Sequence, residues 1–148
     1  MASVERLSPE LLVKYLESRR LGYERDDETD YRVEFPFDPE LGCALHIWLL
    51  LGGRDRQILS VRAVGQIPIA RTEFEKVLDL CNEWNSDRRW PKAYLYRRTP
   101  ADDVGAIYLE ENIDLAPGVH QELLEDWLDT MRSASVEFWI WAHGEKGL

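Results

Sequence analysis

The sequence predicts an α+β domain in which helices flank an antiparallel sheet, in the order α-β-β-β-α-β-β-α. Segments 31–37 and 43–51 have the two-residue alternation of strands. Segments 8–22, 72–87 and 120–142 have the apolar spacing of helices. Because short turn sequences join the strands, we expect hairpins in one sheet with the helices packed on it.

The first helix is expected to begin at Ser8 and Pro9, which suit an N-cap and a first helical position, and to stop at Gly22. Its apolar stripe is formed by Leu11, Leu12, Tyr15 and Leu16. The acidic stretch 26–30 is expected to be a solvated hairpin turn beside a short strand near Tyr23. A cation site is the alternative, although the spacing of a calcium loop is absent.

The next three segments are expected to be strands. In the first, Tyr31, Val33, Phe35 and Phe37 alternate with polar residues or proline. In the second, residues 43–51, both faces are largely apolar, so we expect both faces to be covered. Residues 52–55 have turn chemistry and lead into a return strand over 58–64.

The second half is expected to contain two helices separated by two strands. Thr72 and Glu75 have the capping-box spacing at a helix start, and strands follow at 92–98 and 104–111. The helix over 72–87 has an apolar face made by Phe74, Val77, Cys81 and Trp84. The last helix is expected to face the core with Leu123, Trp127, Met131, Ala134, Phe138 and Trp141.

Composition limits the classes of function. The chain has 148 residues and no repeat or linker, so we expect one domain over residues 1–148. Its net charge of −10 opposes binding to nucleic acids and anionic membranes. Cys43 and Cys81 lie in apolar segments, which predicts free buried thiols. With no secretion signal and no membrane-spanning stretch, we expect a cytoplasmic protein.

No catalytic motif is present in the sequence. His46, His120 and His143 are far apart, and the pair Glu110 and Glu111 would point to opposite faces of a strand. We expect no catalytic residue, no metal and no cofactor. An enzyme with an unfamiliar site is the alternative.

The segment 80–95, LCNEWNSDRRWPKAYL, is the most informative. Asn85 falls on the apolar side of its helix, and a buried amide needs hydrogen-bond partners. We expect Asn85, together with Asn82, to bind backbone groups of the turn from Arg88 to Pro91, with Trp84 and Trp90 packed on either side. A ligand site at these residues is the alternative.

In this segment the chain resembles the bacterial YbjN family. The resemblance is carried by the runs 82–85, 88–89 and 91–94, and further on by 109–110, 114–115, 118–119 and 138–139. It implies a fold like that of type III secretion chaperones, with the element order given above. It also implies a role as a bacterial sensory-transduction regulator, and it brings no catalytic residues.

We therefore expect a non-enzymatic protein-binding module, either a regulator or a chaperone-like adaptor, that forms a homodimer. The expected contact surface is the end of the last helix, where Phe138, Trp139, Ile140 and Trp141 surround the helix with apolar groups. Folding back of these groups onto the same subunit is the alternative. A second alternative function is nucleic-acid or anion binding by the basic segment Arg88–Arg98, which the acidity of the chain opposes.

Overall fold

The computed structural model describes residues 3–27 and 29–148. Its element order confirms the predicted fold class; β1 is the short strand expected near Tyr23, and β5 is a short strand that was not predicted. The elements are α1 (Pro9–Ser18), β1 (Glu24–Asp27), β2 (Asp30–Asp38), β3 (Cys43–Gly52), β4 (Ile58–Gly65), β5 (Ile69–Ala70), a 3-10 turn (Arg71–Glu73), α2 (Phe74–Asp87), β6 (Lys92–Tyr96), β7 (Val104–Asp114) and α3 (Gln121–Gly144).

All strand pairs in the sheet are antiparallel. Strands β4 and β6 both pair with the same part of β7, residues 108–110, so they lie on its opposite edges. The sheet order is therefore β1-β2-β3-β4-β7-β6, and β5 pairs with the first residues of β7. Strands β1 and β6 form the two edges of this sheet.

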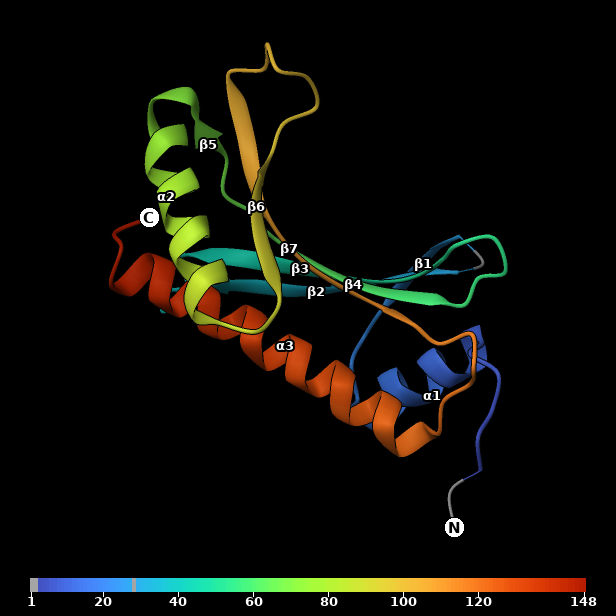
Figure 1. Ribbon diagram of the computed structural model, residues 1–148. Helices are drawn as coiled ribbons and strands as arrows, with labels where there is room; N and C mark the ends of the chain where they lie inside the picture. Colours follow the sequence, from blue (N-terminus) through green and yellow to red (C-terminus); the bar gives the residue numbers. More distant parts are fainter. Residues whose placement is uncertain (1–2, 28) are drawn as a thin grey trace.

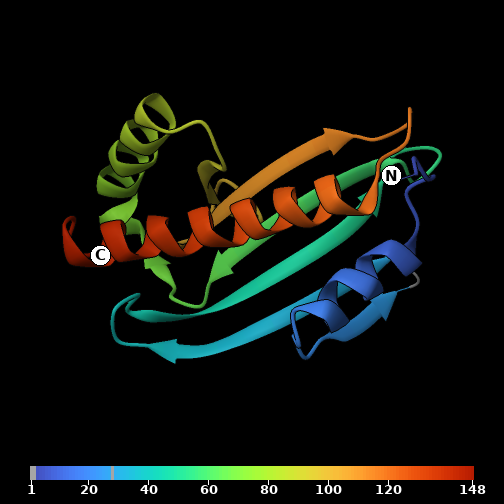
Figure 2. The same cartoon turned by 90° about the horizontal axis from the view of Figure 1, so that it is seen from below.

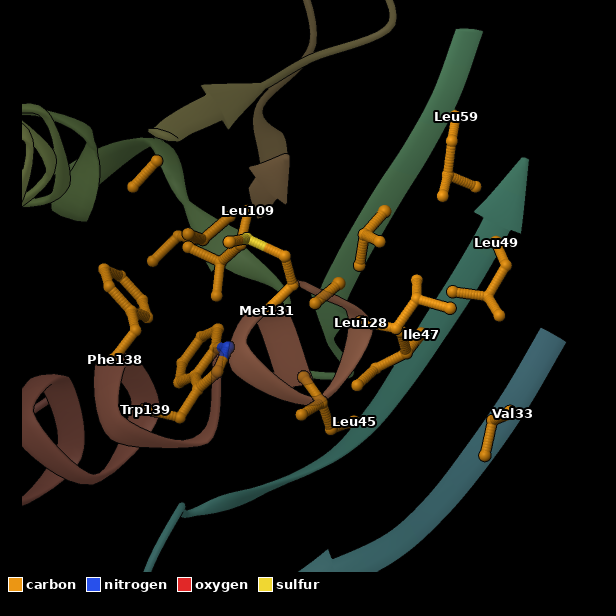
Figure 3. Close-up of a cluster of buried hydrophobic side chains, with 14 of the residues drawn as sticks. Val33, Leu45, Ile47, Leu49, Leu59, Leu109, Leu128, Met131, Phe138 and Trp139 are labelled. Atoms are coloured by element: carbon orange, nitrogen blue, oxygen red, sulfur yellow. The ribbon is translucent and has the colours of Figure 1, made fainter. Parts of the chain in front are cut away.

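One face of the sheet carries the helices. Helices α1 and α3 lie across this face, and α2 lies beside the β6 end (Figures 1 and 2). Every odd-numbered residue of β3 is buried on this side. Figure 3 shows Met131, Phe138 and Trp139 of α3 packed near Leu45 and Leu109 of the sheet. The hydrophobic core therefore lies between α3 and the central strands.

The other face of the sheet is open. The expectation that both faces of segment 43–51 are covered is wrong, because the even-numbered residues of β3 are only half-buried. Arg32, Arg62 and Glu110 lie on the same outward side in the neighbouring strands. Charged neighbours of this kind are compatible with solvent rather than with a second apolar layer.

Three predictions near the ends of helices or strands are wrong. Helix α1 stops at Ser18, and the left-handed residue after it is Arg20, with φ of 56°, rather than Gly22. Helix α2 begins at Phe74 after the 3-10 turn, so Thr72 does not cap it. Phe37 is 66% exposed because the pairing of β2 with β3 shifts register after residue 35.

Helix α3 is rotated relative to its predicted orientation. Leu124, Leu128 and Trp139 are buried, whereas Leu123 is 49% exposed and Trp127 only half-buried. The Trp139 ring occupies the space above the glycine at position 65, where an added Cβ would lie 2.2 Å from it. Because glycine has no side chain, the Trp139 side of the helix can pack against the sheet here.

Among the residues that the structure describes, no helix is long and apolar enough to cross a membrane.

Candidate functional site

A groove runs between the flank of α3 and strand β2. Its volume is about 380 Å³, and we call it the α3 groove. It is lined by Phe35, Ile47, Asp129, Arg132, Ser133, Val136 and Glu137. Because Phe35 and Val136 are only half-buried, the groove offers apolar surface that the chain itself does not cover.

The polar end of the α3 groove is held rigidly by a hydrogen-bond network between α1 and α3. The Asp129 carboxylate accepts from the Tyr15 hydroxyl at 2.8 Å and from the Arg19 guanidinium at 2.7 Å. Arg132 in turn donates to the Tyr15 oxygen at 3.0 Å. The bonds from Arg19 and Tyr15 hold the pKa of Asp129 below its usual value, and burial raises the pKa of Tyr15 to about 12. The network is therefore fixed in one protonation state near neutral pH.

One exposed apolar residue extends the α3 groove. Ile140 follows Val136 by one helical turn on the same flank of α3 and is 36% exposed. The apolar surface therefore continues from the groove toward the C-terminal end of α3.

The predicted contact surface at the end of α3 is only partly present. Phe138 and Trp139 are 0% and 1% exposed, so the expectation that they form free surface is wrong. Trp141 is half-buried, with its ring centroid 5.6 Å from that of Trp84. Of the four residues, only Ile140 is exposed. The aromatic groups fold back because α2 and the sheet together enclose this end of the helix.

Asn85 is exposed, so the expectation of a buried amide is wrong, and its side chain binds the edge of the sheet. Its amide nitrogen donates to the Ala93 carbonyl at 3.0 Å, and its oxygen accepts from the Ala93 N–H at 2.8 Å. Trp84 adds a bond of 2.9 Å from its indole nitrogen to the Pro91 carbonyl. These three bonds, which we call the Asn85 clamp, satisfy backbone groups at β6, an edge strand. The Asn85 amide thus binds Ala93 just beyond the turn that was expected to be its partner.

The other residues of this segment lie outside the clamp. Asn82 is exposed, and its carbonyl accepts from the Ser86 hydroxyl at 2.8 Å. The Arg88 guanidinium lies 4.9 Å from the centre of the Trp84 ring. Trp90, which was expected to pack on the turn opposite Trp84, is 39% exposed.

The cations of the segment Arg88–Arg98 do not converge on one surface. Arg88 faces Glu137 of α3 at 3.8 Å, whereas Lys92 faces Glu110 on the open side of the sheet at 3.4 Å. Arg98 lies two residues beyond the far end of β6, a strand that spans about 13 Å from Lys92 to Tyr96, and faces Asp102. A continuous path for a phosphate backbone is therefore not formed by this segment.

The outward side chains of the sheet form a second surface, which we call the open face. It contains Trp48, Leu50, Val64 and Tyr108 among the charged residues Arg32, Glu34, Arg62, Lys92 and Glu110. The Arg32 guanidinium lies 5.1 Å from the Trp48 ring centroid, and Arg62 bonds Glu110 at 2.8 Å. Burial acts to raise the pKa of Glu110, but bonds from Arg62 and Asn112 outweigh it and lower the pKa.

The cysteines and His120 have structural surroundings. Burial raises the pKa of both the Cys43 and Cys81 thiols to about 11, so neither is a ready nucleophile. His120 caps α3 by accepting from the Leu123 N–H at 3.2 Å. Within residues 3–27 and 29–148, no group of three His, Cys, Asp or Glu side chains could hold a metal ion. Glu28, part of the suggested cation stretch, lies outside the described residues.

A family comparison identifies the chain. A model of the YbjN family, described as "Putative bacterial sensory transduction regulator", matches residues 8–141. The chain belongs to the YbjN family. The match includes the Asn85 clamp and most of α3.

Two solved structures are similar to the chain, and the first of them agrees with this assignment at the level of the fold. One is YbjN, described as "a putative transcription regulator from E. coli", with a TM-score of 0.77, 10% identity and 97% of each chain covered. Another is an uncharacterized protein from Methanothermobacter thermautotrophicus, with a TM-score of 0.49, 16% identity, and 95% and 99% of the two chains covered. No curated protein matches the chain significantly.

The sequence analysis missed both surfaces of this YbjN-family chain. The α3 groove is lined by Phe35 and Val136, which are about one hundred residues apart in the sequence, so no local sequence pattern predicts it. The open face could have been predicted from the sequence. Arg32, Arg62 and Glu110 occupy the strand positions that alternate with core residues, and such charges indicate an uncovered face.

Proposed function

We propose that this YbjN-family chain is a non-enzymatic protein-binding module, a regulator or chaperone-like adaptor of the cytoplasm, which holds an apolar segment of a partner protein in the α3 groove. The observation that carries the proposal is the groove itself. Its apolar lining, Phe35 and Val136, remains half-exposed although the core beneath it is fully packed. Uncovered apolar surface beside polar groups is typical of protein contact sites.

The shape and edges of the groove support a peptide-like occupant. Its floor is Ile47, and its walls come from a strand and a helix that are each fixed by other contacts. Asp129 and Arg132 at one end are bound to α1, so the groove does not need to reorganise when a partner enters. A preorganised site lowers the entropic cost of association.

The alternatives have less support. An enzyme needs groups with pKa values near the working pH. The pKa values of Tyr15, Cys43, Cys81 and Asp129 are shifted away from neutrality, whereas burial moves the pKa of Glu111 toward it. A nucleic-acid interface needs a basic surface, and the cations of 88–98 are dispersed and face acidic residues at several positions. The description of the E. coli relative as a transcription regulator is compatible with regulation through protein contacts.

A pair of arginine substitutions on the same helix tests the proposal. Ile140→Arg places a charge at the end of the α3 groove, whereas Leu123→Arg places one at an exposed position of α3 that does not line it. We expect Ile140→Arg to reduce partner co-purification from native cells at least tenfold, because it costs more than about 1.4 kcal/mol of binding. Quantitative mass spectrometry measures the loss, and circular dichroism verifies folding.

Proteins that depend on the α3 groove are those retained by the wild type and Leu123→Arg but lost from Ile140→Arg. If both folded variants retain every wild-type partner equally, the groove is not the binding site.

A further inference from the structure

The last residues of β7 have no neighbouring strand on one side. Strand β6 pairs with β7 over residues 106–110, whereas β4 pairs with it over residues 108–114. Beyond residue 110, the side of β7 that faces away from β4 therefore has no strand beside it among the described residues. Figure 2 shows this half of β7 at the border of the sheet. We call residues 111–114 the β7 edge, which the Asn85 clamp on β6 does not reach.

The backbone of the β7 edge offers hydrogen bonds to an added strand. In an antiparallel pair, alternate residues direct both their N–H and their C=O toward the same neighbour. The Leu115 N–H bonds the Gln57 carbonyl on the β4 side, so the odd-numbered residues of β7 face β4. Asn112 and Asp114 consequently direct their backbone groups outward, and both residues are exposed. Unpaired groups of this kind are a template for a strand from another chain.

The inward side of the β7 edge combines a carboxylate with an apolar group. Glu111 and Ile113 are two residues apart in the strand, so their side chains point to the same side of the sheet. This is the side of the core, because their partners in β4, Val61 and Leu59, are buried. Glu111 and Ile113 are themselves only half-buried, so part of each side chain stays uncovered.

Glu111 is a carboxylate without a partner. Within the part of the chain that the structure describes, its side chain makes no hydrogen bond and no ion pair. Burial raises the pKa of Glu111, and the charge that opposes this shift, Lys92, is itself paired with Glu110 on the open face. A cation that reached the Glu111 carboxylate would stabilise its charged form.

Helix α3 adds apolar surface next to the β7 edge. The α3 groove occupies the flank of this helix that faces β2. The opposite flank faces the β6 end of the sheet, because Trp141 on this flank lies against Trp84 of α2. Trp127 lies on the same flank about four helical turns earlier, in the half of α3 that runs beside the end of β7 (Figure 2). Its side chain packs against the core but is only half-buried.

These features fit an extended segment with a central lysine or arginine. In a strand placed antiparallel to the β7 edge, the residue opposite Ile113 points inward. The aliphatic stem of a lysine or arginine at this position covers Ile113 and Trp127, and its charged end reaches diagonally to Glu111. The residues before and after it exchange backbone hydrogen bonds with Asn112 and Asp114. The net charge of −10 also favours a basic segment.

We propose that the β7 edge binds an extended basic segment of a partner protein as an additional strand, with one lysine or arginine opposite Ile113 and its charge at Glu111. This surface lies on the other flank of α3 from the α3 groove. The inference therefore does not rest on the proposed function, and either surface can be occupied while the other is empty.

A peptide selection on the full chain tests the charge contact. A phage library of random heptapeptides is selected on the immobilised wild type, and binders lost from Ile140→Arg are assigned to the α3 groove. The retained peptides should share a lysine or arginine at one position. Selection on Glu111→Lys should replace it by aspartate or glutamate. Glu75→Lys, the same charge change at an exposed residue of α2, should leave the lysine or arginine in place.

A pair of substitutions at one residue tests the added strand. Asn112→Pro removes the outward N–H without removing a backbone bond to β4, whereas Asn112→Ala keeps this N–H and loses the same side chain. We expect the dissociation constant of a retained peptide to be at least tenfold higher for Asn112→Pro than for Asn112→Ala. Fluorescence anisotropy measures it, and circular dichroism verifies the fold. In the wild type, bound peptide should slow hydrogen exchange of the Asn112 amide at least tenfold.

Several results would overturn the proposal. They are a selection in which Ile140→Arg retains no peptide, retained peptides without a basic position, and a Glu111→Lys variant that still selects lysine or arginine. Equal exchange of the Asn112 amide with and without peptide also overturns it. A lower sedimenting mass of Asn112→Pro than of the wild type would instead assign the β7 edge to a second copy. Failure of the α3 groove leaves these readings unchanged, because the two peptide classes are scored separately.

Discussion

Asn85 stabilises the sheet edge with a side chain in place of a neighbouring strand. Its amide presents one donor and one acceptor, which match the N–H and C=O of Ala93. An unpaired edge strand is a template for association with other chains. Asn85 therefore both stabilises β6 and directs association away from this edge.

Removal of the Asn85 clamp should destabilise the protein. Asn85→Ala deletes two hydrogen bonds, so we expect the free energy of unfolding to fall by about 1–3 kcal/mol, measured by urea denaturation. Asn82→Ala is the matched control, because it makes the same substitution in the same helix at an exposed residue outside the clamp. Equal stabilities of the two variants would show that the clamp contributes nothing.

Helix α1 is attached to α3 through Asp129 and not through apolar packing alone. The carboxylate binds both Tyr15 and Arg19 of the first helical region. Since Asp129 also lines the α3 groove, this attachment holds the polar end of the groove in place. The electrostatics of the network therefore determine the shape of the site.

The contribution of Asp129 should depend on pH. Its folded pKa lies below the unfolded value of about 4, so its stabilising effect is complete above pH ~4 and is lost as the pH falls through the folded value. We expect the free energy of unfolding of the wild type, measured by urea denaturation, to exceed that of Asp129→Asn by about 1 kcal/mol at pH 7. This difference in stability should shrink below pH ~4. Asp126→Asn, on the same helix, is the control. A difference that persists unchanged to pH 2 would contradict the assignment.

The fold of the whole molecule was more predictable than its surfaces. The inward alternation of β3 and the order of the elements follow from local periodicity, so the sequence analysis found them. The rotation of α3 did not follow, because apolar residues make up half of this helix and a glycine on a distant strand decides which side is buried. The α3 groove and the open face combine segments far apart in the chain, and their geometry exists only in the folded sheet.

The most direct test of the central claim is a photo-crosslink at the α3 groove in living cells. Ser133, an exposed residue that lines the groove, is replaced by benzoyl-phenylalanine, and Trp90, an aromatic residue that is 39% exposed after α2, is replaced in the same way as a control. We predict a covalent adduct with another protein at position 133 that is absent at position 90 and is suppressed by Ile140→Arg. Equal crosslinking at both positions, or none at position 133, would contradict the account.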